Sequence, residues 1–121
     1  MNIRAIEANG IPIAVVHSET AVITDGQSAL DFMMNVQYDT GSHAIAINKE
    51  ALSEDFFILS TGVAGEGLQK FINYRFRLAI VGDFPGYTSK PLKDFMFECN
   101  NGTSIFFVSS ESQAMEKLSK G

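Results

Sequence analysis

The sequence predicts a single α/β domain, and three features of its patterning support this. Short apolar runs, typical of strands that are buried on both faces, occur at residues 44–47, 76–81 and 105–108. Segments with helical spacing of apolar residues separate these runs, at residues 62–74 and 91–100. Two further β-prone runs come before them. The predicted order is therefore β-β-α-β-α-β-α-β-α, a mixed, mostly parallel sheet that starts with an N-terminal β-hairpin.

The hairpin is predicted from residues 2–8 and 11–17, which flank Asn9-Gly10. This dipeptide supplies positive φ at both central positions of a type I′ turn. Pro12 stands early in the second run, which suits a position where no neighbouring strand needs its missing N–H.

Capping signals predict where two helices start. Thr24-Asp25-Gly26-Gln27 reads as a capping box in which Thr24 and Gln27 close the first helix start, and Ser110-Glu111-Ser112-Gln113 reads as another. We also expect Glu66 and Lys70 to pair at i,i+4. The buried positions expected in the four helices are Leu30, Met33 and Met34; Ala64, Leu68, Phe71 and Ile72; Leu92, Phe95, Met96 and Cys99; and Ala114, Met115 and Leu118.

Composition limits the classes of function. The 121 residues are 45% hydrophobic, which suits one domain with its own core over residues 1–121. A net charge of -5 argues against nucleic-acid binding, because phosphate contacts require clustered Lys and Arg. No apolar run approaches the roughly 20 residues that cross a bilayer, so we expect no membrane partner. The single cysteine, Cys99, cannot form an internal disulfide, and we therefore expect a cytoplasmic protein.

The connection over residues 48–60 is long and contains four consecutive apolar residues, Phe56-Phe57-Ile58-Leu59. We expect a short extra helix after Ser53. The apolar cluster either closes over the core or docks a partner, which could be another protein or a second copy in a homodimer.

The following helix start carries hydroxyls at Ser60 and Thr61 and three glycines at Gly62, Gly65 and Gly67. Because glycine costs about 1 kcal/mol relative to alanine inside a helix, these positions require a reason. They indicate either a helix start that binds a small anion or close packing between elements. The spacing fits neither a P-loop nor a dinucleotide fingerprint.

Ligands of open α/β sheets bind outside the carboxyl ends of the parallel strands. We expect six side chains to gather along this rim: Lys49, Glu50, Asp55, Thr61, Asp83 and Tyr87. The alternative is that Asp83 only caps a turn and that Lys49 and Glu50 are solvated.

Little in the sequence indicates catalysis. His17 and His43 stand alone without partners at metal-ligand spacing, so we predict no metal site and no cofactor. Asp94 and Glu98 suit a solvated helix face, and no Ser-His-Asp or Cys-His arrangement is evident. The sequence therefore favours a non-enzymatic protein and names no catalytic residue.

The order of elements resembles the STAS-type fold of bacterial anti-sigma-factor antagonists. In those proteins an Asp-Ser-Ser-Gly-Leu-Gly-like segment follows the third strand, and a serine there is the phosphorylation switch. Leu59-Ser60-Thr61-Gly62 occupies the corresponding place, with Leu59 instead of the acid. The resemblance implies that Ser60 or Thr61 is a phosphoacceptor.

A second resemblance covers nearly the whole chain and is to the bacterial Domain of Unknown Function 4180 family, which implies no activity. It rests on Lys49-Glu50, Asp55-Phe56-Phe57, Thr61-Gly62-Val63-Ala64-Gly65-Glu66, Gln69-Lys70-Phe71, Asn73-Tyr74, Ala79-Ile80-Val81-Gly82-Asp83-Phe84, Asp94-Phe95 and Glu98.

We therefore expect a regulatory or protein-interaction module that binds another protein or itself. The alternative is a small-molecule or anion-binding protein, which could be an enzyme, with a pocket at the carboxyl ends of the parallel strands. The candidate binding residues are Lys49, Glu50, Asp55, Phe56, Phe57, Thr61, Gly62, Gly65, Glu66, Asp83 and Tyr87.

Overall fold

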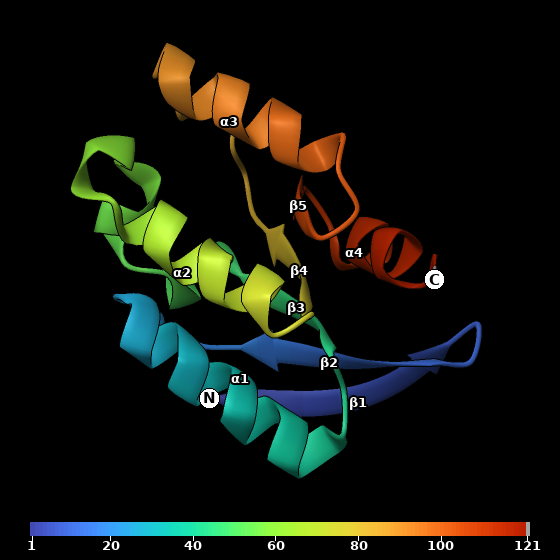
Figure 1. Ribbon diagram of the computed structural model, residues 1–121. Helices are drawn as coiled ribbons and strands as arrows, with labels where there is room; N and C mark the ends of the chain where they lie inside the picture. The colour runs from blue at the N-terminus through green and yellow to red at the C-terminus, as the bar shows by residue number, and fades with distance from the viewer. Residues whose placement is uncertain (121) are drawn as a thin grey trace.

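The computed structural model describes residues 1–120, which form one five-stranded sheet with helices on both faces (Figure 1). The strands lie side by side in chain order. The first, β1 (Asn2–Ala8), is antiparallel to β2 (Ile11–His17). The remaining strands, β3 (Ala44–Asn48), β4 (Arg77–Val81) and β5 (Ile105–Val108), continue the sheet in parallel with β2. The predicted order of elements and the mixed, mostly parallel sheet are confirmed.

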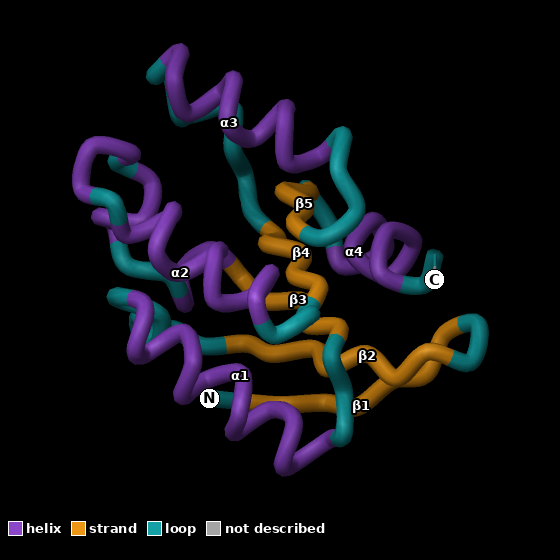
Figure 2. The backbone as a smooth tube through the Cα atoms, viewed as in Figure 1, coloured by secondary structure: helices purple, strands orange, loops and turns teal. Residues whose placement is uncertain are grey.

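The four helices cover the two faces of the sheet unequally (Figure 2). The larger core lies beneath α1 (Gly26–Thr40), α2 (Val63–Asn73) and α3 (Lys90–Asn100). The opposite face packs against α4 (Glu111–Leu118), a helix of 8 residues. One face of the sheet is therefore covered much less than the other.

The hairpin turn confirms its sequence signal. Asn9 and Gly10 have φ values of 53° and 77°, as a type I′ turn requires. Pro12 lies opposite Glu7 of β1, and pairing of β2 with β3 starts one residue later, at Ile13. Its missing N–H therefore removes no bond to β3.

The first helix start differs from the prediction by one residue. Asp25 is the N-cap, and its carboxylate accepts a hydrogen bond from the Ser28 backbone N–H at 2.7 Å. The Ser28 hydroxyl in turn accepts from the Asp25 N–H at 3.0 Å. Asp25 and Ser28 thus form the capping box assigned above to Thr24 and Gln27. The prediction was wrong because Thr24 and Gln27 offer capping side chains at the same three-residue spacing as Asp25 and Ser28.

The start of α4 fits its prediction in part. The Ser110 hydroxyl accepts from the Gln113 N–H at 3.1 Å, as a capping box requires. The Gln113 side chain accepts instead from the Ser109 N–H at 2.9 Å, one residue before the cap.

Most predicted core positions are buried, with two corrections. Met34 of α1 is 37% exposed, while Phe32 and Val36 lie in the core. Ile72 of α2 is 48% exposed because it lies at the rim of the buried helix face. Apolar spacing alone does not reveal which side of an apolar stripe the neighbouring helix covers.

The connection between β3 and α2 consists of three short 3₁₀ turns, η1 (Lys49–Ala51), η2 (Glu54–Phe57) and η3 (Leu59–Thr61). The second turn confirms the extra helix expected after Ser53. We call residues 53–62 the lobe. Phe56 and Phe57 are buried, so the apolar cluster mainly closes over the core, whereas Ile58 is 52% exposed.

Within residues 1–120, none of the helices combines the length and the apolar character that a membrane crossing needs.

Candidate functional site

Three of the predicted rim residues, Lys49, Glu50 and Tyr87, line one hollow at the carboxyl end of β3. Its volume is about 350 Å³. The full lining consists of Glu19, Lys49, Glu50, Leu52, Glu54, Phe57 and Tyr87. The structure therefore groups part of the predicted rim around the aromatic side chain of Phe57.

Lys49 is held across this hollow by backbone and aromatic groups. Its ammonium donates a hydrogen bond to the Asp83 carbonyl at 3.3 Å and lies 5.1 Å from the centroid of the Tyr87 ring. Tyr87 stacks on Phe57 with 5.0 Å between ring centroids and 16° between planes. A side chain at Gly82 would approach the stem of Lys49 to 2.6 Å, so the glycine leaves the space through which Lys49 passes. The aromatic faces favour a cation at this position.

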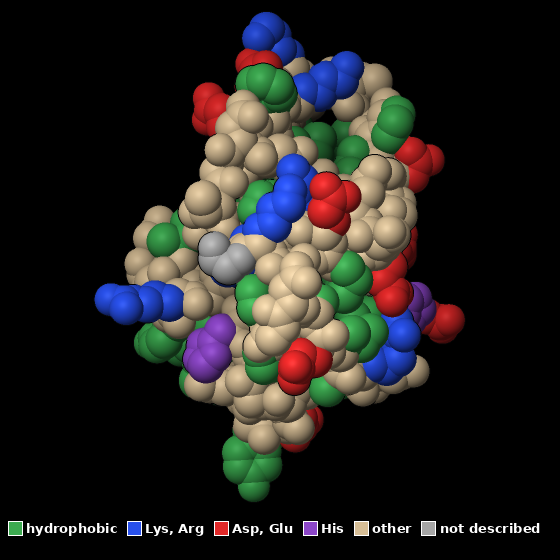
Figure 3. Space-filling view, turned by 90° about the vertical axis from the view of Figure 1, so that its right-hand side faces the viewer, with side chains coloured by type: hydrophobic (Ala, Val, Ile, Leu, Met, Phe, Trp, Pro, Cys, Tyr) green, Lys and Arg blue, Asp and Glu red, His purple; other side chains and the backbone are tan. Residues whose placement is uncertain are grey.

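The charges around the hollow disfavour a small anion. Glu19, Glu50 and Glu54 contribute three carboxylates against the single ammonium of Lys49. An incoming anion would therefore meet net repulsion. Elsewhere on the surface, the face in Figure 3 shows acidic and basic side chains interspersed with hydrophobic ones rather than one large basic patch.

Thr61 and Asp55, two of the other three predicted rim residues, belong to the lobe. The Thr61 hydroxyl lies 2.7 Å from the Asp55 carbonyl oxygen and 2.8 Å from that of Ile58, and it donates to them. It also accepts from the Val63 N–H at 3.3 Å. Thr61 therefore closes the lobe onto the start of α2. Asp83 is not among the residues that line the hollow, and its backbone carbonyl accepts the hydrogen bond from Lys49.

The glycines at the start of α2 have different roles. Gly62 has a φ of 79° and is the N-cap, without a side-chain hydrogen bond to the helix. A Cβ at Gly65 would meet no atom within 4 Å, whereas one at Gly67 would lie 3.9 Å from Ala29 and Ile23. Contacts of 3.9 Å are ordinary, so close packing does not explain the glycine at position 67, while Gly62 is required by its left-handed backbone.

Glu66 does not act as the sequence suggested. Its carboxylate accepts a hydrogen bond from the Gly26 backbone N–H at 3.1 Å, at the start of α1. Within residues 1–120 it forms no ion pair with Lys70. The i,i+4 rule missed this because the Glu66 partner comes from a different helix.

The remaining reactive groups are separate from one another. His43 packs on the ring of Phe76 with 4.9 Å between centroids. Asp94 pairs with Lys90 at 2.7 Å on an exposed helix face. Burial, together with the charge of Glu98, raises the pKa of the Cys99 thiol, which lowers its reactivity. No cluster of three or more His, Cys, Asp or Glu in the described chain could hold a metal ion.

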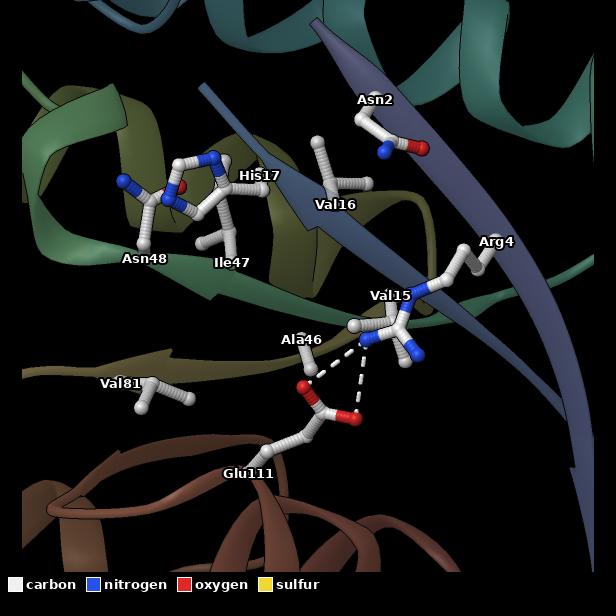
Figure 4. Close-up of a pocket in the computed structure, with 10 residues that line it drawn as sticks. All are labelled: Asn2, Arg4, Val15, Val16, His17, Ala46, Ile47, Asn48, Val81 and Glu111. Atoms are coloured by element: carbon white, nitrogen blue, oxygen red, sulfur yellow. Dashed lines mark hydrogen bonds and ion pairs between the residues drawn. The ribbon is translucent and has the colours of Figure 1, made fainter. Parts of the chain in front are cut away.

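Sequence reasoning missed a cavity of about 330 Å³ on the α4 side of the sheet (Figure 4). Its lining residues are Asn2, Arg4, Val15, Val16, His17, Ala46, Ile47, Asn48, Val81 and Glu111. It lies at the carboxyl ends of β2 and β3, where the general rule places ligands. Arg4 of β1 and Glu111 of α4 form an ion pair beside it. The Asn9-Gly10 turn signal could have placed Arg4 opposite Val15, but nothing local indicates the approach of Glu111.

Comparison with known families gives one match. The DUF4180 family, described as a domain of unknown function, matches residues 8–118. This span is most of the chain, so the protein belongs to the DUF4180 family, and the family resemblance noted above is confirmed. No curated protein and no solved structure matches the chain.

Proposed function

We propose that this member of the DUF4180 family is a non-enzymatic regulatory module that binds another protein through the lobe and the start of α2. One observation supports this most directly. Ile58 is 52% exposed within a segment whose neighbours Phe56 and Phe57 are buried to 1% and 8% exposure. A segment anchored in this way presents an apolar side chain without having to order itself on binding, which favours affinity.

The proposal includes control by phosphorylation at Ser60. Ser60 is exposed and lies two residues from Ile58. The Thr61 hydroxyl already donates to backbone carbonyls, so its modification would break the closure of the lobe. A phosphate on Ser60 adds a charge of about −1.5 to −2. It would stand beside the start of α2, where Gly62 supplies no side-chain cap and the helix dipole favours negative charge.

The STAS-like arrangement and a cytoplasmic location are further parts of this proposal. The element order supports the first, and the single cysteine supports the second.

Two matched variants test the docking surface. Ile58→Asp places a charge on the lobe, and Ile72→Asp places the same charge at a residue that is similarly exposed on α2, 48% against 52%. In affinity purification from the native cells, we expect Ile58→Asp to lose a protein that wild type and Ile72→Asp both retain. Equal retention by all three proteins would overturn the lobe as the docking surface.

Mass spectrometry of the tryptic peptide of residues 50–70 tests the switch separately. This peptide contains Ser53, Ser60 and Thr61. We expect phosphate at Ser60 under at least one growth or stress condition. A peptide that stays unmodified throughout would remove the switch and leave constitutive binding.

A second candidate function is the binding of a small molecule at the Lys49 hollow. The stacked pair of Phe57 and Tyr87 and the acidic rim favour an organic cation there. A thermal-shift screen with cationic compounds tests it, because a ligand of the native state raises the melting temperature. The shift should disappear in Tyr87→Ala.

A further inference from the structure

The cavity beside α4 lies outside the proposed docking surface, and its floor is apolar. Val15, Ala46 and Val81 come from three adjacent strands, and their side chains point toward the cavity in Figure 4. Val15 and Ala46 belong to the core on the α4 side of the sheet, and the partly buried Val81 packs against it. Because two of them are valine and one is alanine, they leave room above the sheet for a small apolar group.

The charged part of the cavity is the ion pair between Arg4 and Glu111. The Arg4 Nη2 donates to both carboxylate oxygens of Glu111, at 3.0 Å and 2.9 Å. Both side chains are about half exposed, 53% and 49%. Ion pairs with this exposure stabilise a fold little, so the pair can adjust to a ligand without destabilising the protein.

Both partners keep unused hydrogen-bonding capacity. A guanidinium has five N–H donors, and within residues 1–120 only the Arg4 Nη2 has an acceptor. Its Nε and Nη1 lie on different edges of the guanidinium, and each can still donate to a carboxylate oxygen. The Glu111 carboxylate has about four acceptor positions and can accept further hydrogen bonds from an ammonium. A ligand with both charges can thus add to the pair instead of displacing it.

We propose that this cavity binds an α-amino acid with an apolar side chain. Its carboxylate binds Arg4, its ammonium binds Glu111, and its side chain lies against Val15, Ala46 and Val81. A simple anion would be attracted by Arg4 but repelled by Glu111. A simple cation would be attracted by Glu111 but repelled by Arg4. A zwitterion satisfies both charges at once. The cavity volume of about 330 Å³ falls at the lower end of the range of about 300–1,000 Å³ for ligand pockets, which suits a small ligand.

Calorimetric titration of the full chain tests this with three probes that share one apolar tail. L-leucine carries both charges, 4-methylpentanoate lacks the ammonium, and 3-methylbutylamine lacks the carboxylate. We expect saturable binding of L-leucine and at least about tenfold weaker binding of each analogue, because each lacks one charge contact and is repelled by the partner of like charge. This comparison uses the wild-type protein and does not depend on the folding of a variant.

Variants then locate the site. Arg4→Gln and Glu111→Gln should each weaken L-leucine binding at least about tenfold. Lys93→Gln, a change on the exposed surface of α3, should leave it unchanged. The proposal is overturned if L-leucine shows no saturable binding, if either analogue binds as well as L-leucine, or if both cavity variants bind like wild type. None of these outcomes bears on partner binding at the lobe.

Discussion

The carboxylate of Glu66 caps the start of α1 by accepting a hydrogen bond from the Gly26 N–H at 3.1 Å. The two residues are 40 positions apart in the chain and lie near the starts of neighbouring helices. A Cβ on residue 26 would approach Glu66 Oε1 to 2.5 Å. The glycine therefore leaves room for the carboxylate, and the bond ties the start of α2 to the start of α1.

This relationship predicts a coupled pair of substitutions. Glu66→Ala should lower the free energy of unfolding by about 1 kcal/mol, since it removes a cap from a helix start. Gly26→Ala should stabilise the protein only in the Glu66→Ala background, where helix propensity improves without a clash. In the wild-type background, the new methyl group would displace the carboxylate.

Urea unfolding of the four proteins measures this coupling as a double-mutant cycle. Glu98→Ala, a change on the exposed face of α3, is the control and should alter stability by less than about 0.5 kcal/mol. Additive effects of the two substitutions would contradict the predicted contact.

The structure of the lobe predicts that alanine substitutions at two adjacent residues differ strongly in their effect on stability. Phe57 is 8% exposed and packs against the rings of Phe56, Phe84 and Tyr87, so Phe57→Ala should destabilise the fold by about 3–5 kcal/mol. Ile58 is 52% exposed, so Ile58→Ala should change stability by less than about 0.5 kcal/mol. Thermal or urea unfolding measures both. Similar losses in the two variants would mean that the lobe is anchored differently.

Asn100 protects an edge of the sheet. Its side-chain amide donates to the Phe107 carbonyl at 3.1 Å and accepts from the Phe107 N–H at 2.7 Å, so it occupies the outer side of β5. Asn100→Ala should destabilise the protein by about 1–3 kcal/mol, because two backbone groups lose their partner. It should also increase aggregation, since the strand edge becomes free to pair. Light scattering during storage measures this, with Asn101→Ala as the control that should remain soluble.

The capping box of α1 predicts a pH effect. Hydrogen bonds from the Ser28 backbone and then the Ser28 side chain hold the pKa of Asp25 below its usual range. A carboxyl whose pKa is lower in the folded state stabilises the protein above its unfolded-state pKa, and this contribution is lost as the pH falls through the folded-state pKa. Asp25→Asn should therefore reduce the loss of stability on acidification. Urea unfolding from neutral pH to about pH 2 compares the free energies of unfolding of the two proteins. An equal loss of this free energy in both proteins as the pH falls would contradict the prediction.

Local signals in the sequence were sufficient for much of the fold. Asn9-Gly10 predicts the hairpin because its backbone conformation depends on neighbouring residues alone. The apolar runs predict three parallel strands because strands that are covered on both faces are apolar throughout. The capping box of α1 was misplaced by one residue, because Thr24 and Asp25 are both suitable N-caps and only the tertiary structure selects between them.

The candidate site was less predictable because it depends on contacts between distant segments. The rule about the carboxyl ends of strands placed Lys49 and Tyr87 correctly beside one another. It could not place Thr61, whose hydroxyl turns toward its own lobe. The cavity beside α4 arises only when β1 and α4 meet, and Arg4 and Glu111 are separated by 107 positions.

The central claim is that the lobe is a docking surface. Site-specific photo-crosslinking in the native cells is its most direct test. A photoreactive amino acid replaces Ile58 in one protein and the similarly exposed Ile72 in another. We predict a discrete adduct with another protein from position 58 and none of that size from position 72. The same adducts from both positions, or none from position 58, would contradict the account.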